Sequence, residues 1–351
     1  MQPLYEGAAR MYYYFEHKSI QPYSLSLSAL LGLILLFPLQ LFGAEQPDSP
    51  APYVVPQTQK SDRYDSVEKP RNYLSGKITR FASDIDRFFG GDRHYQESNQ
   101  TVIQLNLTGG AGYGNDRNYD LGARINLRLP VTEARLHLLL ETDPEKNIIT
   151  GTTPAQDNAV VRNKIVTPKS LAVAVRVAAE EESVWNFNTD VGIKFPIPVK
   201  PFVRTRGSYA AALGEWRLKA AESVYWFNTL GVGETTQLDM ERIVSDSILF
   251  RATTNATYLN DKKNFDLRQD FSFYHTLNDR TALLYQASAI GVSNPQLQVT
   301  DYVALLFYRY RMHKEWLFFE LSPQLHFPRE KNFKASPAIS LRLAILFDDS
   351  R

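Results

Sequence analysis

The chain has 351 residues, with 39 basic and 38 acidic side chains, a formal net charge of +1 and no cysteine. These values exclude disulfides and thiolate metal sites, and the balanced charge gives no support to a nucleic-acid partner. A hydrophobic content of 44% and a mean hydropathy of −0.31 exclude a bundle of membrane-spanning helices. A membrane β-barrel fits both values, because only every second residue of its strands meets lipid.

The N-terminus carries one strongly apolar helical run, at residues 25–37. Basic residues such as Lys18 precede this run, and Ala44 offers a small-residue cleavage point. This arrangement is typical of a secretory signal peptide, which we predict over residues 1–44. A single membrane anchor is the alternative, and it is disfavoured because Pro38 ends the run and no basic stop-transfer cluster follows.

Residues 45–97 are predicted to form a periplasmic leader. Its first part is rich in Pro, Ser, Asp and Gln, which favours a flexible chain. Residues 78–89 then place Ile78, Ile85 and Phe89 on one stripe of a short amphipathic helix that stops at two glycines. The sequence leaves three locations for this helix open: the periplasm, the inner rim of a barrel, or the lumen.

From residue 98 to the C-terminus, segment after segment alternates apolar and polar residues, the period of two that is typical of β-strands. Fourteen strands are predicted to begin near residues 101, 118, 133, 169, 184, 201, 215, 234, 247, 264, 280, 299, 315 and 337. Short polar turns follow every second strand, as on the periplasmic side of bacterial barrels. We therefore predict an all-β fold, a single transmembrane antiparallel β-barrel of about 14 strands over residues 98–351. A count of twelve stays open because residues 231–247 are ambiguous.

One face of the predicted strands is apolar and the other carries charges. An Arg or Lys facing lipid at the midplane would cost about 2–4 kcal/mol, so the polar face is expected to line the lumen. The expected lumen-lining residues are Arg124, Arg128, Arg135, Glu141, Arg176, Asp190, Lys194, Arg204, Arg206, Asp239, Arg251, Asp266, Arg268, Asp270, Arg309, Arg311, Glu320 and Arg342. These charges form either a basic-biased surface that selects small anionic solutes or an ion-paired network that stiffens the wall. The interspersed signs favour the network.

Three of the four tryptophans, Trp185, Trp216 and Trp316, each follow a predicted periplasmic turn. Trp226 lies at the far end of its strand, near the other predicted membrane edge. Indole rings prefer the headgroup level of a bilayer, so all four are expected to form girdles at the membrane edges.

The last predicted strand closes on Phe347, with alternating apolar residues before it, and looks like the C-terminal sorting signal of bacterial outer-membrane proteins. A short overhang, residues 348–351, departs from that pattern. The chain resembles uncharacterised outer-membrane barrels of Gram-negative proteobacteria, most clearly at residues 308–320 and in the FFGG segment at residues 88–91. The resemblance implies export to the outer membrane, contact with its lipids and with the barrel assembly machinery during biogenesis, and no assigned activity.

The sequence shows no metal-ligand spacing, and no catalytic residue or cofactor is predicted. His94 and Ser98 superficially resemble a lipase pair, but residues four apart on a strand lie too far apart to touch. The leading hypothesis is therefore a small-solute channel or a structural envelope protein. The sequence favours a protein without enzymatic activity over an enzyme. A lipid-active barrel enzyme and an assembly or secretion partner that docks through its leader are the alternatives.

Overall fold

The computed structural model describes residues 65–90, 95, 100–112, 117–129, 136–149, 170–178, 185–195, 197–312 and 316–348. The predicted signal peptide, the first part of the leader, the His94 and Ser98 pair and Arg135 lie outside these residues. No helix within the described ranges is long and apolar enough to cross a membrane.

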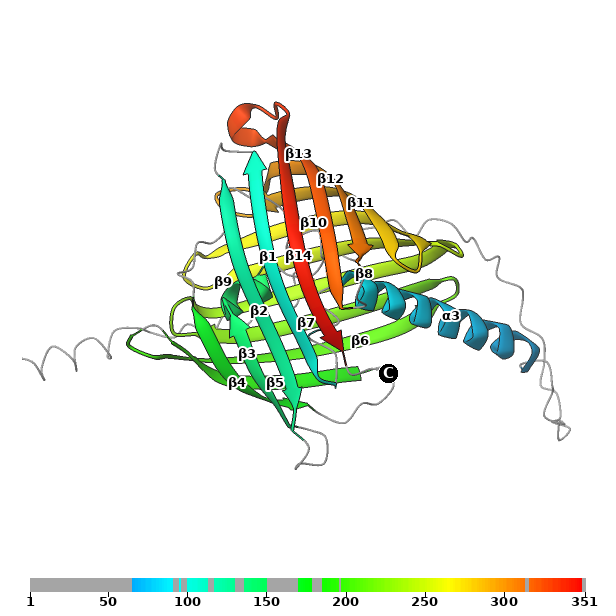
Figure 1. The fold of residues 1–351 in the computed structure, drawn as a ribbon, viewed down its shortest axis with the longest axis horizontal. Coiled ribbons are helices and arrows are strands. Elements are labelled where there is room, and N and C mark those ends of the chain that lie inside the picture. Colours follow the sequence, from blue (N-terminus) through cyan, green and yellow to red (C-terminus); the bar gives the residue numbers. More distant parts are fainter. Residues whose placement is uncertain are drawn as a thin grey trace, which may run out of the picture. The chain divides into compact units, whose positions relative to one another are not determined.

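Fourteen antiparallel strands form a closed barrel, in which each strand pairs with its neighbours in sequence and the first pairs with the last (Figure 1). The strands are β1 (Val102–Gly112), β2 (Asn118–Arg128), β3 (Leu136–Thr142), β4 (Leu171–Ala178), β5 (Trp185–Lys194), β6 (Lys200–Leu213), β7 (Trp216–Phe227), β8 (Gly231–Ser245), β9 (Ile248–Leu259), β10 (Asn264–Asn278), β11 (Thr281–Val292), β12 (Gln298–Arg311), β13 (Leu317–Pro328) and β14 (Ser336–Asp348). The predicted fold is confirmed. The ambiguous stretch forms one continuous 15-residue strand, β8, so the count of twelve is wrong.

The strand starts follow the predicted ones closely, with the largest displacements at β3 and β8. Two short helices lie in connections at the end of the barrel opposite the tight turns. They are α5 (Pro144–Ile149), between β3 and β4, and the 3-10 turn η1 (Arg329–Lys331), between β13 and β14. The tight turns, such as the one between Leu213 and Trp216, mark the predicted periplasmic end.

The outer surface of the barrel is apolar. On β5, Phe187, Val191 and Ile193 are exposed, whereas the alternate residues Asp190 and Lys194 are buried. The same alternation recurs along the other strands, so large aliphatic and aromatic side chains cover the outside. A water-soluble protein rarely exposes so continuous an apolar surface, and this exterior is that of a barrel that spans a membrane.

Trp185, Trp216 and Trp226 lie at the ends of strands and on the outside, whereas Trp316, just before β13, lines a cavity at the rim of the barrel. Trp185 is 56% exposed and Trp226 is 40% exposed, whereas Trp216 and Trp316 are half-buried. Trp216 is the first residue of β7 and Trp226 lies next to its last, so the two rings mark the two edges of the apolar band on one strand. Interfacial girdles would have tryptophans at these two levels, and the girdles stay a prediction.

Lipid contact at these positions can be measured by fluorescence. In a variant that keeps Trp185 and has the other three tryptophans replaced by Phe, we expect strong quenching by brominated phospholipids, because the indole faces the bilayer. A variant that keeps only Trp316 is the control. Its ring stacks on Phe347 at a centroid distance of 5.4 Å, so its quenching should be weaker. Quenching of Trp185 by aqueous iodide and not by lipid would contradict a lipid-facing wall.

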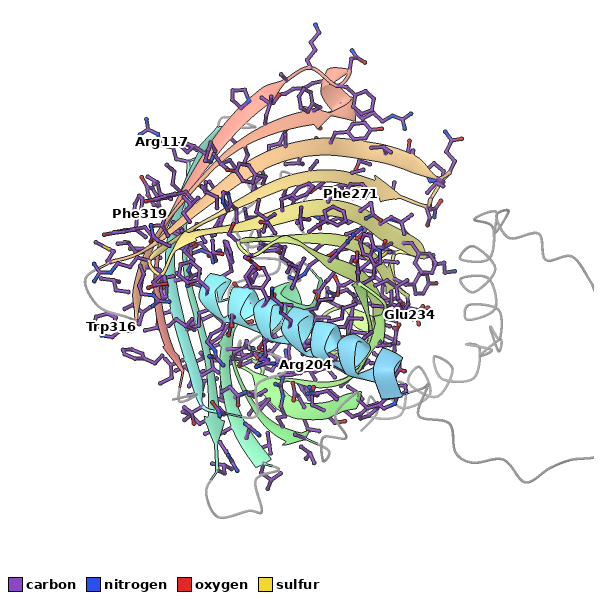
Figure 2. All side chains as sticks on the ribbon, turned by 90° about the vertical axis from the view of Figure 1, so that its right-hand side faces the viewer. Arg117, Arg204, Glu234, Phe271, Trp316 and Phe319 are labelled. Atoms are coloured by element: carbon purple, nitrogen blue, oxygen red, sulfur yellow. The ribbon has the colours of Figure 1, made fainter. Side chains whose placement is uncertain are left out.

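One long helix, α3 (Asp65–Phe89), precedes the barrel. It begins well before the predicted residue 78. The sequence prediction missed residues 65–77 because they are mostly polar and show no apolar stripe. Ile78, Ala82, Ile85 and Phe89 are buried, and the last three of these belong to a cluster of inward-facing residues from the wall. Figure 2 shows α3 crossing the opening of the barrel. Of the three locations left open by the sequence, the structure selects the lumen for the last turns of α3, whereas Lys77 pairs with Asp246 in the turn after β8, at the rim.

Candidate functional site in the charged lumen

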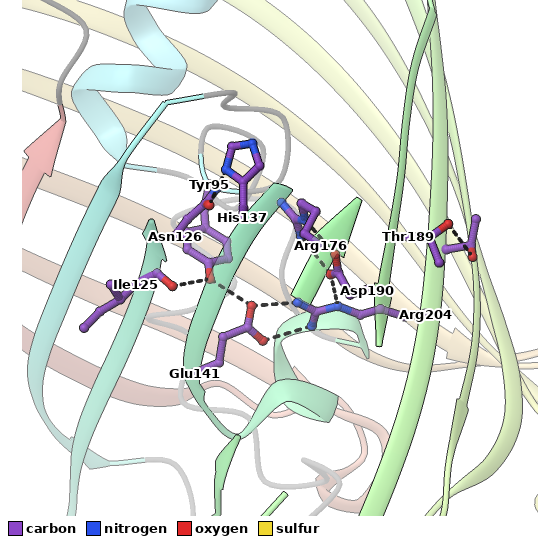
Figure 3. A network of polar contacts seen from close by, with 10 residues as sticks. Tyr95, Ile125, Asn126, His137, Glu141, Arg176, Thr189, Asp190 and Arg204 are labelled. Carbon is purple, nitrogen blue, oxygen red and sulfur yellow. Dashed lines mark hydrogen bonds and ion pairs between the residues drawn. The ribbon is translucent and has the colours of Figure 1, made fainter. Parts of the chain in front are cut away.

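A chain of ion pairs on the inner wall of β3 to β6 forms the centre of the candidate site (Figure 3). The Arg204 guanidinium donates to both oxygens of Glu141, at 2.9 and 2.7 Å, and its Nε donates to Asp190 at 2.6 Å. Arg176 donates two further hydrogen bonds to Asp190, at 2.7 and 2.9 Å. The Tyr95 hydroxyl donates to Glu141 at 2.9 Å. Two cations and two carboxylates thus form one continuous network.

Strand register positions these side chains. Asp190 lies directly opposite Arg176 on one neighbouring strand and directly opposite Arg204 on the other. Such cross-strand neighbours lie close enough for their side chains to interact. All of these groups are buried, with Asp190 only 1% exposed. A buried pair of this kind adds little net stability, but removal of one partner is strongly destabilising.

Tyr95 and Asn126 extend this network toward the predicted periplasmic end of the barrel. Burial raises the pKa of the Tyr95 phenol well above its ordinary value, so the hydroxyl stays protonated and donates to Glu141. The Asn126 Oδ1 atom lies 2.8 Å from the His137 Nδ1 atom on the neighbouring strand. Because Tyr95 precedes the first strand, the network joins a segment outside the sheet to the wall.

The connection after β3 also enters the lumen. Glu145, in the first turn of α5, is fully buried and contacts the Lys194 ammonium and the Thr229 hydroxyl. Ile148 of the same helix is buried as well. The start of this long connection therefore folds inward, a point that the sequence left open.

Two arginines connect the wall to α3. Arg251 of β9 forms ion pairs with Glu241 at 2.7 Å and with Asp86 of α3 at 2.8 Å. Its guanidinium also lies 4.9 Å from the centroid of the Tyr274 ring. Because Arg251 is 1% exposed, it needs this carboxylate from the helix as well as the one from the wall.

Arg309 of β12 binds the end of α3. One guanidinium nitrogen donates to the Phe89 carbonyl oxygen and to Glu320, each at 2.6 Å, and the group stacks 3.9 Å from the Phe318 ring centroid. The Gly90 carbonyl oxygen accepts a hydrogen bond from the Gln104 amide at 3.3 Å. The carbonyl groups at a helix C-terminus carry partial negative charge, so a cation there stabilises the docked helix.

Gly90 allows this close approach. Its φ of +58° is left-handed, and a Cβ atom there would lie 3.3 Å from an Arg309 nitrogen. We expect Gly90→Ala to cost about 1–2 kcal/mol from the backbone alone, plus a further loss of α3 docking. Gly214→Ala is the matched control, because Gly214 has a φ of +62° and no atom within 4 Å of a Cβ. Thermal unfolding measures stability, and protease sensitivity of α3 should rise only in Gly90→Ala.

A cavity of about 840 Å³ lies between the end of α3 and the rim of the barrel. Phe81, Phe88, Arg311 and Trp316 are among its lining residues. The Arg311 guanidinium lies 5.2 Å from the Phe88 ring centroid and 5.7 Å from that of Phe318. This vestibule therefore presents aromatic faces and a cation at the predicted periplasmic entrance.

The structure places most of the predicted lumen residues on the inner face. Twelve are buried: Arg124, Glu141, Arg176, Asp190, Lys194, Arg204, Asp239, Arg251, Asp270, Arg309, Glu320 and Arg342. Four are half-buried: Arg206, Asp266, Arg268 and Arg311. Arg128 is exposed at the end of β2, so it does not belong to the interior network, because the strand ends there. The pairs that form combine basic and acidic residues, as the interspersed signs indicated.

Three contributors were missing from the sequence prediction: Tyr95, Glu145 and Asp86. Tyr95 lies before the first strand and Glu145 lies in a long connection, so neither has a strand alternation to mark its direction. Asp86 faces Arg251 from the helix, and helical spacing showed only that it lies beside the apolar stripe. The position of the Asp86 carboxylate beside the apolar stripe was the one sequence feature that could have indicated this contact.

No protein-family model matches this sequence, and no curated protein matches it. Among solved structures, OprB of Pseudomonas putida is similar over 74% of this chain and 97% of its own, with 11% identity and a TM-score of 0.43. The outer-membrane channel DcaP of Acinetobacter baumannii is similar over 71% and 96%, with 11% identity and a TM-score of 0.39. The NanC porin is similar over 69% and 98%, with 8% identity and a TM-score of 0.36. Since all three scores are below 0.5, the barrel assignment rests on this chain's own strand pairing.

Proposed function

We propose that the chain is an outer-membrane channel for small solutes that α3 keeps closed. The observation that carries the proposal is that a helix from outside the sheet fills part of a charged lumen. α3 is held there by side-chain contacts and by its C-terminus, including Asp86 on Arg251 and the Phe89 carbonyl on Arg309. A plug of this kind can leave while the strand pairing of the wall stays intact.

The charge near the entrance favours anionic solutes. Arg309, Arg311 and Arg342 lie on the inner face of β12 and β14, and Glu320 is the carboxylate that two of them share. Three cations around one carboxylate leave positive charge on this part of the inner wall, while Asp84 and Asp279 add carboxylates to the vestibule beside it. Rings of basic side chains attract and pass anions, so small anions are the proposed cargo.

The proposed location is the outer membrane of a Gram-negative bacterium. The closed barrel and the apolar exterior support it, since a closed sheet leaves no unpaired strand edge in lipid. Export through a signal at residues 1–44 and insertion by the barrel assembly machinery belong to the same proposal.

Planar bilayer recording tests the channel. We expect the full chain to be mostly closed, and a variant lacking residues 65–90 to show a stable ohmic conductance, because the deletion removes α3. Under a salt gradient the reversal potential of the deletion variant should show anion preference. Silence of both proteins would exclude a channel and favour a structural envelope role. The pair considered for lipid hydrolysis lies outside the described residues, so no observation favours an enzyme.

A further inference from the structure

One sector of the outer wall carries polar side chains, in contrast to the apolar exterior elsewhere. We name these residues the outer polar patch. It comprises Thr189, Thr205, Glu222, Glu234, Thr236, Thr254 and Gln269, on β5 to β10. Strand alternation points each of them away from the lumen, because their sequence neighbours on either side face inward. Figure 2 shows Glu234 on the outer side of the wall.

The patch holds the outward-facing carboxylates of the described strands, Glu222 and Glu234. In the register of β7 and β8, Glu222 lies opposite Thr236, and Glu234 lies opposite Val224. The pairs that contain Trp216 and Trp226 lie beyond them on either side. Both carboxylates therefore lie between the two tryptophans of β7, with Glu222 further from Trp226 than Glu234, whose pair is the next outward one to the Trp226 pair.

The patch satisfies only part of its own hydrogen-bonding capacity. The Thr236 hydroxyl donates to one oxygen of Glu222 at 2.6 Å, and the Thr254 hydroxyl donates to the Gln269 side-chain oxygen at 2.6 Å. Within the described part of the chain, Glu234 has no hydrogen-bond donor. Acyl chains supply none, and an unsatisfied polar group in hydrocarbon is unfavourable.

Small outward residues lie among these polar groups. Ala220 precedes Glu222 on the same face of β7, whereas the space above Gly207, which lies opposite Glu222, is occupied by the Phe187 ring, 3.0 Å from a Cβ placed there. Ala252 of β9 also faces outward, one position before Thr254 on that face. Small side chains let another protein backbone approach closely within a membrane.

We propose that the outer polar patch is the contact surface for a second copy of this chain. The patch carries acceptors on its carboxylates, and among the described residues free donors remain on one hydroxyl of the Thr189–Thr205 pair and on one amide hydrogen of Gln269, so it can pair with itself about a two-fold axis. An isologous contact requires such self-complementarity. A second copy would bring donors to Glu222 and Glu234 and exclude the acyl chains that cannot satisfy them.

Cysteine cross-linking tests the contact, because the native chain has no cysteine. In intact membranes, Ala220→Cys treated with a short bis-maleimide should give a product of twice the chain mass. Leu341→Cys is the matched control: Leu341 is outward-facing, 46% exposed and on β14. Its dimer yield should be several-fold lower. Adding Glu222→Leu to Ala220→Cys should reduce the dimer yield to the control level.

Equal dimer yields at the two positions would indicate random collision and overturn the proposal. A cross-linked product that contains a different protein would show that this protein, and not a second copy of the chain, binds the patch. Recovery of monomer alone would exclude the contact. The mass of the purified protein in mild detergent gives an independent readout: twice the chain mass is expected, and the mass of one chain would contradict the proposal. None of these results depends on whether the barrel conducts.

Discussion

Replacing Phe89 by alanine is expected to shift the barrel from closed to open. Phe89 is the last residue of α3, and its ring packs 5.2 Å from the Tyr274 ring and 5.8 Å from the Phe307 ring, measured between centroids. Truncation of a buried Phe costs about 3–5 kcal/mol. A tenfold change in an equilibrium needs about 1.4 kcal/mol, so the ratio of closed to open barrels should fall by roughly two to three and a half powers of ten.

Single-channel recording of Phe89→Ala in planar bilayers measures this shift as a rise in open probability. Ser83→Ala is the control, because Ser83 lies on the exposed face of the same helix and its loss leaves the docked side unchanged. The plug model fails if the two variants have the same open probability while both remain folded.

Arg204→Ala is expected to be the most destabilising single substitution in the wall. It removes three hydrogen bonds to carboxylates, and it leaves the buried Glu141 carboxylate with the Tyr95 hydroxyl as its remaining hydrogen-bond donor among the described residues. Asp190 keeps Arg176. Removal of one partner from a buried pair typically costs about 3–5 kcal/mol.

Denaturant unfolding of the folded barrel in lipid vesicles measures this loss. Arg242→Ala is the matched control, because Arg242 also pairs with a carboxylate, Glu215, and lies 5.4 Å from an aromatic ring centroid. Its side chain is 44% exposed, and exposed pairs contribute at most about 1 kcal/mol. Similar losses in the two variants would show that the interior network does not stabilise the barrel.

Strand alternation carried most of the fold prediction. A strand with one face toward lipid and one toward a polar interior must alternate apolar and polar residues. The side that each side chain faces can therefore be predicted from the local sequence. The stretch at residues 231–247 was ambiguous because Glu234 and Thr236 place polar residues on the outward face of β8. The same two residues belong to the outer polar patch, so this local exception to the barrel pattern coincides with the proposed contact surface.

The inward direction of Arg176, Asp190 and Arg204 was predictable for the same reason, but their partners were not. The choice between Asp190 and another carboxylate depends on the register of β5 with β4 and β6, and the contact of Arg204 with Glu141 joins residues 63 positions apart. The partners contributed by Tyr95 and Glu145 come from segments without strand periodicity. Their positions depend on how the chain folds back into the closed wall.

The sequence alone predicted the barrel and most of the inward-facing side chains, because the period of two is a local property of each strand, while the continuous strand β8 decided fourteen strands over twelve. Tertiary structure decided that α3 enters the lumen, since an amphipathic helix needs an apolar surface and the sequence does not say which one. It also decided how the charges pair, because closure brings together residues from strands far apart in the chain. Local alternation therefore determines which side chains line the lumen, and tertiary packing determines that α3 occupies part of it.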